Sequence, residues 1–588
     1  MCGIFGYVGH GNDGAEKILN GLKTLEYRGY DSWGVAIERS SKILVEKHVG
    51  KIGEAQLKDT AWPTQLGLGH TRWATHGGVT VQNAHPHLSS DGKFAVVHNG
   101  IIENFQELKD QLVAKDVVFT SETDTEVFIQ LLTENTRSYP PAVAFQKTFS
   151  AIQGLNAFVV LSLVDHKLYA VRKGSPLVIG KGKDGYYLAS DAAALARHAS
   201  QVFFIEDQQL VELSDTICQV SDLQTGQQVI PNWQPHHFTK EELTKGSYAH
   251  FLLKEIHQQP TVLQAILTSL DTQLTNYAKK LPNDAFFVGC GSAFHACVTA
   301  SYFFPLIAKQ LVRALPASEF TTTRELLTPD QFVTFVSQSG ETIDVIEHLS
   351  FLKDKNVPFG ALVNRLGSTL ERTSTDKLLL PAGVEQAVLA TKSYTAMVAV
   401  LFLLAHAKAG TLERGKKLLM ETISAIQKVL VPSYEKEYLL PLATKLQSAT
   451  QIFVIGRGNS YPVALEAALK LKEVTYIHTE GFAGGELKHG VIALITPDTP
   501  CIVFAPDDEE SSAVLSNAQE LKSRGAYIIG IGPHSKPVFD SFLPVETHGL
   551  LSAVSLAVPI QLLAYHLAVL RGNDPDKPRN LAKSVTVK

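Results

Sequence analysis

The first part of the chain is dominated by short runs in which apolar and polar positions alternate or β-branched residues cluster. Such runs occupy Phe94–Val97, Phe158–Val164 and Leu177–Ile179, and turn-forming Gly, Asn and Asp residues separate them. This pattern is typical of strands. Helical periodicity appears in two stretches, Ala15–Leu25 and Thr123–Leu132. Strands with a few helices predict a layered α+β domain in this part of the chain.

A polar segment without apolar periodicity, Ile230–Tyr248, follows this region and predicts a linker. Beyond it, apolar strand-like runs alternate with long amphipathic helical patterns, which is typical of parallel sheets built from βαβ units. This half also repeats itself, because Phe286–Tyr302 and Phe453–Leu469 each combine an apolar strand, a Gly-x-Gly turn and a helix. Two copies of one α/β domain are the simplest interpretation.

Composition narrows the function classes. The 588 residues are 45% hydrophobic and 19% charged, which argues for several globular domains and against disorder, collagen or coiled coil. A net charge of −5 has the wrong sign for a dedicated nucleic-acid binder, so small-molecule chemistry is the default. Neither Met397–Ala405 nor Leu550–Leu570 is an uninterrupted apolar span, so both are expected to be buried helices rather than membrane segments.

Cysteine usage and the first residues predict a reducing compartment. The five cysteines are few, odd in number and unevenly spaced, which fits neither a disulfide framework nor a zinc ribbon. The N-terminal segment MCGIFGYVGHGNDG lacks the basic start and apolar core of a signal peptide. We therefore expect a cytoplasmic protein, without a bound metal or other cofactor.

The Gly-x-Gly turns of the two copies raise the question of a nucleotide site. In both, an aromatic residue stands where a dinucleotide fingerprint has its third glycine, and Ser337 or Ala505 stands where it has an acidic residue. NAD or FAD is therefore disfavoured. In the first copy, SQSGET combines hydroxyls with backbone N–H groups at a helix start, which would suit a phosphate. An ordinary helix capping box is an equally good interpretation. The matching APDDEESS segment is acidic, so an anion site is expected in the first copy.

Cys2 is the sharpest chemical candidate. If Met1 is removed, Cys2 carries a thiol together with a free α-amine, whose reference pKa of about 7.7 to 8.0 lets it act as a base. Nucleophile and base would then belong to one residue. Taken alone, a small buried cysteine is the simpler interpretation.

Cys2 does not stand alone, because a series of motifs runs from it in order: CGIFGYVG, LEYRGYDSWG, HTRWATHGG, NAHPH, VHNGIIEN and SETDTE. Together they resemble the class II, N-terminal-nucleophile glutamine amidotransferases. In the second half, SQSGET, EAALKLKEVTYIHTE, GGELKHG and PRNLAKSVTV are similar to the paired sugar-isomerase domains of the glutamine:fructose-6-phosphate amidotransferase family. The resemblance covers nearly the whole chain, at the length typical of bacterial members.

The resemblance implies an α+β N-terminal-nucleophile glutaminase, a four-layer sandwich, followed by two α/β sugar-isomerase domains with parallel sheets. The implied ranges are 2–217 for the glutaminase, 218–274 for its end and a linker, 275–415 and 442–578 for the isomerase domains, and 579–588 for a catalytic tail. The implied activity transfers the glutamine amide nitrogen to fructose 6-phosphate with ketose-to-aldose isomerisation, giving glucosamine 6-phosphate and glutamate.

For glutamine cleavage, the resemblance assigns Cys2 as the nucleophile that forms a thioester and releases ammonia. The Asn99 side chain and the Gly100 N–H would stabilise the oxyanion of the tetrahedral intermediate. Trp73 matches the gate of an internal ammonia channel, although by bulk alone it would be packed core. The residues expected to bind glutamine are Arg72 for the α-carboxylate, Asp124 for the α-ammonium, and Thr75 and His76 beside them.

For the sugar reaction, Glu473 matches the carboxylate that moves a proton from C1 to C2. Lys470, one helical turn earlier, can tune that carboxylate and hold a sugar oxyanion, although a solvent-facing Lys–Glu pair is the plainer interpretation. His489 matches the ring-opening acid/base that reaches the site of a neighbouring subunit, which implies a homodimer. Lys583 matches the lysine that forms a Schiff base with the open-chain ketose. The implied sugar-phosphate ligands are Ser292, Ser337, Gln338, Ser339, Thr342 and Val388.

Two positions depart from the family pattern. Ala293 follows Ser292 where the family has Thr-Ser, and Ala390 replaces the serine of Ala-Ser-Thr-Lys, so two hydroxyls near the sugar are missing. Each lost hydrogen bond to a charged group would cost about 1.5 to 3 kcal/mol. The same chemistry on another ketose phosphate is therefore one alternative. A non-catalytic sugar-phosphate sensor is a second, although a complete set of catalytic candidates argues against it.

Overall fold

The computed structural model describes the chain except for residues 1, 58–62, 236–241, 243 and 587–588. The chain folds into two compact units, one of residues 1–243 together with 582–588, and one of residues 244–581. The boundary at 243 falls inside the polar segment that predicts a linker. The two α/β halves belong to a single unit, and the end of the chain groups with the first unit.

The first unit is built on two antiparallel sheets, with strand orders β15-β11-β9-β10-β1-β4-β2-β3 and β14-β13-β12-β8-β7-β6-β5. The first sheet contains β1 (Gly3–Gly9), β2 (Ser32–Arg39), β3 (Lys42–Val49), β4 (Leu66–Arg72), β9 (Val178–Lys181), β10 (Gly185–Ala189), β11 (Gln201–Phe204) and β15 (Gln234–Pro235). The second contains β5 (His87–Leu88), β6 (Phe94–Gly100), β7 (Asn156–Ser162), β8 (Lys167–Lys173), β12 (Gln209–Leu213), β13 (Cys218–Asp222) and β14 (Gln228–Val229). The helices are α1 (Gly14–Thr24), η1 (Glu26–Arg28), α2 (Phe105–Val113), α3 (Thr125–Thr136), α4 (Pro141–Ser150) and η2 (Ala192–Leu195).

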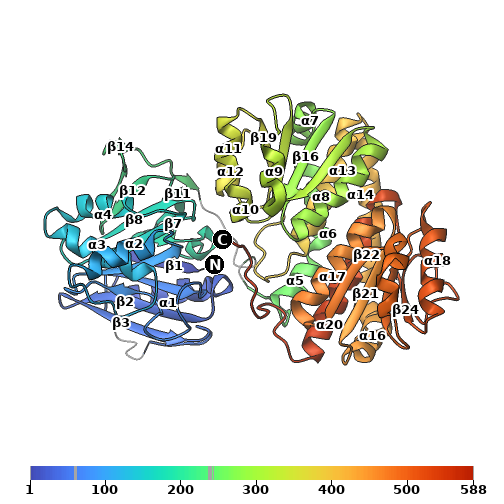
Figure 1. The fold of residues 1–588 in the computed structure, drawn as a ribbon, viewed down its shortest axis with the longest axis horizontal. Helices are drawn as coiled ribbons and strands as arrows, with labels where there is room; N and C mark the ends of the chain where they lie inside the picture. The colour runs from blue at the N-terminus through green and yellow to red at the C-terminus, as the bar shows by residue number, and fades with distance from the viewer. Residues whose placement is uncertain (1, 58–62, 236–241, 243, 587–588) are drawn as a thin grey trace. The chain divides into compact units, whose positions relative to one another are not determined.

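One apolar core lies between the two sheets, and two further cores cover their outer faces. Side chains such as Ile4, Leu68 and Val97 fill the space between the sheets. Helix α1 packs on the outer face of the first sheet, and α2, α3 and α4 pack on the outer face of the second. The result is a helix–sheet–sheet–helix sandwich of four layers (Figure 1), which confirms the predicted fold class of this part of the chain.

Strand β6 shows how alternation positions a functional side chain. Phe94 and Val96 face the helices, whereas Ala95 and Val97 face the other sheet. Because side chains alternate along a strand, Asn99 continues the inward-facing set. A polar side chain therefore enters the space between the sheets where β6 ends.

The second unit contains two parallel five-stranded sheets, ordered β17-β16-β18-β19-β20 and β22-β21-β23-β24-β25. The first consists of β16 (Asp284–Gly289), β17 (Leu311–Pro316), β18 (Phe332–Ser337), β19 (Phe359–Val363) and β20 (Asp376–Leu379). The second consists of β21 (Gln451–Gly456), β22 (His478–Ala483), β23 (Pro500–Phe504), β24 (Tyr527–Gly532) and β25 (Ser541–Pro544). The identical order confirms the predicted pair of parallel α/β domains.

In both sheets the first strand of the copy lies between the second and the third. β16 has β17 on one side and β18 on the other, and β21 lies in the same way between β22 and β23. Open parallel sheets bind ligands at the carboxyl ends of the strands beside such a switch in strand order. The turn after β16 leads to Ser292, and the turn after β18 begins at Ser337. Both turns lie at this switch point.

Helices from both copies share one core (Figure 1), to which α13 (Lys392–Lys408) and α20 (Ala557–Leu570) contribute the largest sets of buried side chains. The helices of the first copy are α5 (Phe251–His257), α6 (Gln259–Ser269), α7 (Asp271–Lys280), α8 (Ser292–Ile307), η3 (Ala317–Glu319), α9 (Phe320–Arg324), α10 (Ile343–Ile346), α11 (Leu349–Asp354), α12 (Thr369–Thr373), α13 (Lys392–Lys408) and α14 (Leu412–Val429). Those of the second are α15 (Pro432–Tyr434), η4 (Glu435–Leu439), α16 (Leu440–Leu446), η5 (Gly458–Ser460), α17 (Tyr461–Thr475), η6 (Gly484–His489), η7 (Val491–Leu494), α18 (Ser511–Lys522), η8 (Gly549–Leu551), α19 (Ser552–Ser555) and α20 (Ala557–Leu570).

The stretch Gly549–Leu570 is long and apolar enough to cross a membrane by length and composition alone. Most of it is buried in the core of the second unit, where α20 packs against α16 and α17. A buried core helix accounts for its composition, as the interrupted apolar pattern predicts.

Candidate active sites

The first candidate site surrounds Cys2, the residue before β1. The Trp73 backbone N–H lies 3.2 Å from Cys2 Sγ, and the Trp73 carbonyl oxygen lies 3.5 Å from the same sulfur. Burial raises the pKa of the Cys2 thiol above its ordinary value. A thiol reacts as a nucleophile only after a base removes its proton. The site therefore needs a base such as the α-amine of Cys2, which is free once Met1 is removed; Met1 lies outside the described residues.

Asn99 and Gly100 lie beside Cys2, at the end of β6. Asn99 Nδ2 donates to the Cys2 carbonyl oxygen at 3.0 Å. Gly100 has a φ of +140°, and a Cβ at this position would come within 2.5 Å of the Leu155 carbonyl oxygen, so the backbone requires glycine. The structure thus brings Asn99, one of the two predicted oxyanion donors, next to the predicted nucleophile, and Gly100 follows it in the chain.

Two charged residues of the LEYRGYDSWG motif support this arrangement, and sequence reasoning assigns them no role. Arg28 Nε donates to the Cys2 carbonyl oxygen at 3.3 Å, and the Arg28 guanidinium pairs with buried Asp191 at 3.1 Å. Asp31 accepts the Ala74 N–H at 2.8 Å and so holds the turn after β4. Both residues could have been noticed in the sequence, because they are charges placed among the aromatic residues and glycines of a motif that follows Cys2.

The predicted glutamine-binding charges are both buried. Arg72, at the end of β4, donates to the carbonyl oxygens of residues 76–78 at 2.5 to 3.2 Å. Asp124, just before α3, accepts the Ile102 N–H at 2.8 Å. An amino acid carries an α-carboxylate and an α-ammonium. The Arg72 guanidinium is suited to the first and the Asp124 carboxylate to the second.

The other predicted members of this pocket lie on the turn after β4. The Trp73 ring packs edge-on against Tyr30 at 5.6 Å between ring centroids, and the His76 ring packs in the same way against Phe105 at 5.3 Å. Thr75 lies between them in the chain. The turn is therefore held by packing as well as by Arg72.

The second candidate site lies at the switch point of the first parallel sheet. Ser337 Oγ accepts the Gly340 N–H at 3.0 Å and lies 3.2 Å from Thr342 Oγ1. Ser339 Oγ accepts the Glu341 N–H at 3.2 Å. Gln338 belongs to the same turn. Hydroxyls and N–H groups thus converge in a compact turn, as the phosphate interpretation expects.

The helix after this turn differs from the expectation. α10 contains only four residues, Ile343–Ile346, so it has a small dipole to offer an anion. The hydroxyls and N–H groups of the turn, rather than a long helix, are the polar groups available there.

A buried charge cluster lies on α17. Lys470 Nζ is 2.7 Å from Glu473 Oε2 and 3.4 Å from Glu466 Oε1, and the Lys470 side chain is only 1% exposed. Ser292 donates to Glu466 at 2.9 Å and accepts from Lys470 at 3.1 Å. Burial alone would lower the pKa of Lys470, but Glu466 and Glu473 outweigh it and raise that pKa. The solvent-facing Lys–Glu pair, which was the plainer interpretation, is therefore wrong.

Sequence reasoning misses two members of this cluster, Glu466 and His295. His295 Nδ1, on α8, lies 2.8 Å from Glu466 Oε2. Burial would raise the pKa of Glu466, but Lys470 and His295 outweigh it and hold that pKa below its ordinary value. Glu466 could have been found by its spacing, since it precedes Lys470 by four residues on one helix face. His295 comes from the other copy and has no such signal.

The remaining predicted residues are spread over the chain. The Val388 N–H donates to the Asp576 carbonyl oxygen at 3.1 Å, which fixes the segment before α13. His489 is exposed at the end of η6. Lys583 belongs to the terminal residues that group with the first unit. The roles of His489 and Lys583 at the sugar site stay predictions. Ala293 is buried on α8 and Ala390 is half-buried, and neither offers a hydroxyl.

The matching position of the second copy contains an ion pair. Arg457, after β21, pairs through Nε with Glu510 at 2.9 Å. The Arg457 guanidinium at this switch point is therefore already paired with a carboxylate, which agrees with the expectation that an anion site belongs to the first copy.

Both parts of the chain match models of known protein families. The glutamine amidotransferase domain model matches residues 47–249, and the SIS domain model matches residues 282–407 and 445–571. Glutamine–fructose-6-phosphate aminotransferase (isomerizing) of Pyrococcus horikoshii is 39% identical over all of both chains, and that of Thermococcus kodakarensis is 40% identical over all of both chains. The C-terminal domain of glucosamine-fructose-6-phosphate aminotransferase from Francisella tularensis is 30% identical, with a TM-score of 0.52, and covers 57% of this chain and 99% of that one.

The chain belongs to the glutamine–fructose-6-phosphate aminotransferase (isomerizing) family. Glutamine amidotransferase and sugar-isomerase domains occur in one chain, in the order that the motifs predict. The glutaminase candidates of this aminotransferase-family chain therefore lie in the four-layer unit, and its sugar-site candidates other than Lys583 lie in the parallel α/β unit.

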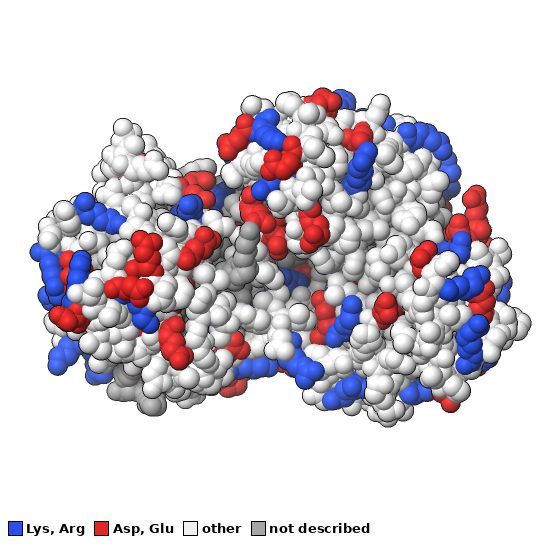
Figure 2. Space-filling view, viewed as in Figure 1, with Lys and Arg blue, Asp and Glu red and all other residues white. Residues whose placement is uncertain are grey.

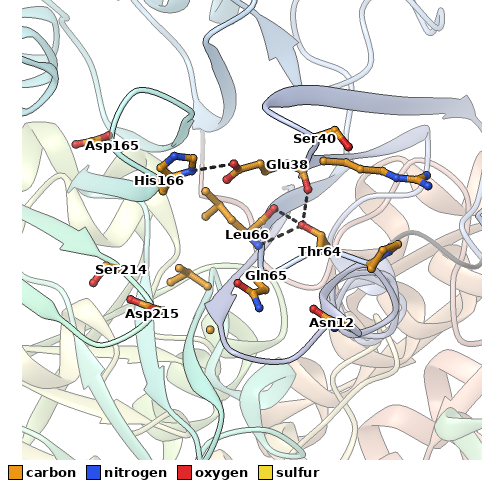
Figure 3. A pocket seen from close by; sticks show the side chains of 14 residues that line it. Asn12, Glu38, Ser40, Thr64, Gln65, Leu66, Asp165, His166, Ser214 and Asp215 are labelled. Atoms are coloured by element: carbon orange, nitrogen blue, oxygen red, sulfur yellow. Dashed lines mark hydrogen bonds and ion pairs between the residues drawn. The ribbon is translucent and has the colours of Figure 1, made fainter.

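A large hollow in the first unit of this family member lies away from Cys2. Its lining includes Gly9, Glu38, His166 and Asp215, and its volume is about 560 Å³ (Figure 3). Gly9 ends β1, whereas Cys2 precedes the start of the same strand, so the length of β1 separates the hollow from the nucleophile. The hollow is not the glutamine site.

Acid should destabilise the first unit through its buried histidines. Burial lowers the pKa of His70 from 6.5 to about 3, and it lowers the pKa values of His85 and His87 well below 6.5. The folded state thus binds protons less readily than the unfolded state. Stability due to His70 is complete above about pH 6.5 and declines as the pH falls toward 3, with a loss of about 2 kcal/mol by pH 5.

Tryptophan fluorescence can report this effect selectively. The four tryptophans, at positions 33, 62, 73 and 233, all precede residue 244, where the second unit begins. Urea unfolding followed by this signal should give a lower free energy of unfolding at pH 5 than at pH 7, and a His70→Gln variant should show a smaller difference. An unchanged pH dependence in the variant would exclude His70 as a source of it.

Lys470→Met should destabilise the second unit by about 3 to 5 kcal/mol, because it leaves the buried Glu466 carboxylate and the half-buried Glu473 carboxylate without their cation. Lys472→Met is the matched control, since Lys472 lies on the same helix and is exposed. Thermal unfolding followed by circular dichroism should show a lower Tm for Lys470→Met alone. Equal Tm values for the two variants would contradict the buried ion cluster.

Proposed function

We propose that the chain transfers the amide nitrogen of glutamine to fructose 6-phosphate and isomerises the product, giving glucosamine 6-phosphate and glutamate. The observation that carries this proposal is the presence, in one chain, of a nucleophile site at Cys2 and a buried Glu466–Lys470–Glu473 cluster at an isomerase switch point. The full-length relatives support it, since their names state an isomerizing amino transfer between glutamine and fructose 6-phosphate.

In the first unit, Cys2 Sγ attacks the glutamine amide carbon after the α-amine has taken the thiol proton. The Asn99 amide and the Gly100 N–H stabilise the resulting oxyanion. The carbon–nitrogen bond then breaks, ammonia leaves with the proton from the α-ammonium, and water hydrolyses the thioester to glutamate. Arg72 and Asp124 hold the amino-acid end of glutamine during these steps.

In the second unit, ammonia condenses with the C2 carbonyl of the open-chain ketose, and water is lost. Glu473 removes a proton from C1 of the resulting imine and returns it to C2, while the proton of the C1 hydroxyl passes to the nitrogen, so that C1 becomes the aldehyde and C2 carries the amine. Lys470 stabilises negative charge on the sugar oxygen during this transfer. The turn from Ser337 to Thr342 holds the phosphate.

The test is incubation of the pure protein with glutamine and several ketose 6-phosphates. Formation of glucosamine 6-phosphate from fructose 6-phosphate, detected by mass spectrometry, is expected. Ala293 and Ser292 make the alternative substrates worth measuring, because Ala293 has no hydroxyl and the Ser292 hydroxyl is engaged by Glu466 and Lys470. A higher kcat/KM for another ketose phosphate would favour the same chemistry on that sugar. Tight sugar-phosphate binding without any product would favour a sensor.

The assembly and setting are further parts of the proposal. A homodimer would let His489 of one subunit reach a neighbour, and the exposure of His489 supports this arrangement. Light scattering should then give about twice the chain mass of 64.1 kDa; a monomer mass would contradict it. Acidic and basic side chains are interspersed over the visible face of each unit (Figure 2), which supports small-molecule substrates rather than nucleic acid. A cytoplasmic location fits the free cysteines among the described residues.

A further inference from the structure

The orientation of the Asn99 side chain decides whether it can serve as an oxyanion donor. Its amide has a donating end, Nδ2, and an accepting end, Oδ1. The Cys2 carbonyl oxygen, 3.0 Å away, can only accept, so the end of Asn99 that faces Cys2 must be Nδ2. A flipped amide would present Oδ1 to Cys2 and to the negative charge that develops there. Something on the far side of the amide must therefore discriminate between its two ends.

His70 lies on that far side. Its Nε2 is 3.1 Å from Asn99 Oδ1 and 3.0 Å from the His98 carbonyl oxygen. The carbonyl oxygen can only accept, so Nε2 must carry the proton of the neutral ring. The same N–H then faces Oδ1 and would oppose Nδ2 in a flipped amide. The backbone carbonyl oxygen of Cys2 thus determines which end of the Asn99 amide faces it, and that of His98 determines which nitrogen of His70 carries the proton.

The fold keeps the His70 ring in this tautomer and position. His70 follows Leu66 and Leu68 on the inward face of β4, and its side chain is fully buried. It reaches from the first sheet to β6 of the second, across the space between them. The His85 ring covers it at 4.3 Å between centroids. Burial favours the uncharged ring, which has a single proton to place.

We propose that His70 is a positioning residue for glutamine cleavage, whose Nε2–H holds the Asn99 amide with its donor end toward Cys2. This role rests on the proposed glutaminase function, because it acts only through the oxyanion that forms at Cys2. His70 does not contact glutamine in this account. Stacked imidazoles such as His70 and His85 also suggest a metal, but within the described ranges no group of three such side chains is arranged to hold one.

A pair of amide variants separates this role from simple packing. Glutamine places its side-chain NH₂ near the position of His Nε2, whereas asparagine is one carbon shorter and ends near Nδ1. We expect His70→Asn to lower kcat for glutamine hydrolysis about 10- to 100-fold with KM within about twofold, and His70→Gln to recover most of it. His10→Leu, at a 61% exposed histidine side chain of the same unit, is the control and should match the wild type.

The decisive measurement is a double-mutant cycle on kcat. Asn99→Ala should cost about 100- to 1000-fold, the usual cost of losing an oxyanion donor. Adding His70→Asn to Asn99→Ala should then have no further effect, because the amide that His70 holds is already gone. A multiplicative loss in the double variant, a raised KM with unchanged kcat, or equal rates for His70→Gln and His70→Asn would overturn the proposal.

Two controls separate a change in glutamine cleavage from poor folding and from damage to the sugar site. Titration of Cys2 with a radiolabelled haloacetamide counts the folded sites, so kcat is expressed per reactive thiol even if a variant folds poorly. Synthesis from fructose 6-phosphate with ammonium salts should be unchanged in every variant, since it bypasses Cys2. If the wild type itself releases no glutamate from glutamine, the proposed function fails; if it does and the cycle is multiplicative, only the role of His70 fails.

Discussion

Cys2→Ala should abolish glutamine-dependent synthesis of the amino sugar, lowering its rate about 10⁴-fold or more, because the thioester cannot form without the thiol. With ammonium chloride in place of glutamine, the same variant should still make product, since the Glu466–Lys470–Glu473 cluster lies in the other unit. Parallel assays with the two nitrogen sources, read by mass spectrometry of the product, give both numbers from one preparation.

Cys218→Ala is the matched control for this result. Cys218 is another half-exposed thiol of the same unit, on β13, and neither site uses it. It should retain wild-type rates with both nitrogen sources. Normal use of glutamine by Cys2→Ala would contradict the assignment of the nucleophile.

Glu473→Gln should stop formation of the amino aldose with either nitrogen source, by about 100- to 10,000-fold, because an amide cannot carry the proton from C1 to C2. Glutamine side chains match glutamate in shape and leave an oxygen for Lys470, so the fold should persist. Hydrolysis of glutamine at Cys2 should continue, which distinguishes this variant from Cys2→Ala. Product formation and glutamate release, measured in the same reaction, check the prediction.

Glu480→Gln provides the control, since Glu480 is an exposed residue on the strand that follows α17. It should behave as the wild type. In deuterated water, wild-type product should also gain some deuterium at C2 through exchange at the Glu473 carboxyl group. An active Glu473→Gln variant would assign the proton transfer to another residue.

The fold could be predicted from the sequence where the apolar periodicity was long or repeated. Alternation around Phe94–Val97 corresponds to β6, and the helical stretches at Ala15–Leu25 and Thr123–Leu132 correspond to α1 and α3. The repeated strand–turn–helix pattern corresponds to two sheets of identical order. α2 and α4 escaped prediction, because helices of 9 and 10 residues offer few repeats of an apolar pattern.

The site was accessible only where contacts follow the chain or a known motif. Lys470 and Glu473 are one helical turn apart, so their proximity could be predicted, but Lys470 is buried where it contacts Ser292 on α8 of the other copy. His295 and Asp191 come from distant segments, and nothing local marks them as partners of Glu466 and Arg28. His70 lies within a quoted motif, yet its role emerges only when two sheets face each other.

The central claim is that nitrogen released at Cys2 becomes the amine of the sugar. The most direct test supplies glutamine labelled with ¹⁵N at the amide, together with fructose 6-phosphate and unlabelled ammonium at a concentration too low to support synthesis alone. The account predicts glucosamine 6-phosphate that carries ¹⁵N, together with an equal amount of glutamate. Unlabelled amino sugar, or glutamate release without any amino sugar, would contradict it.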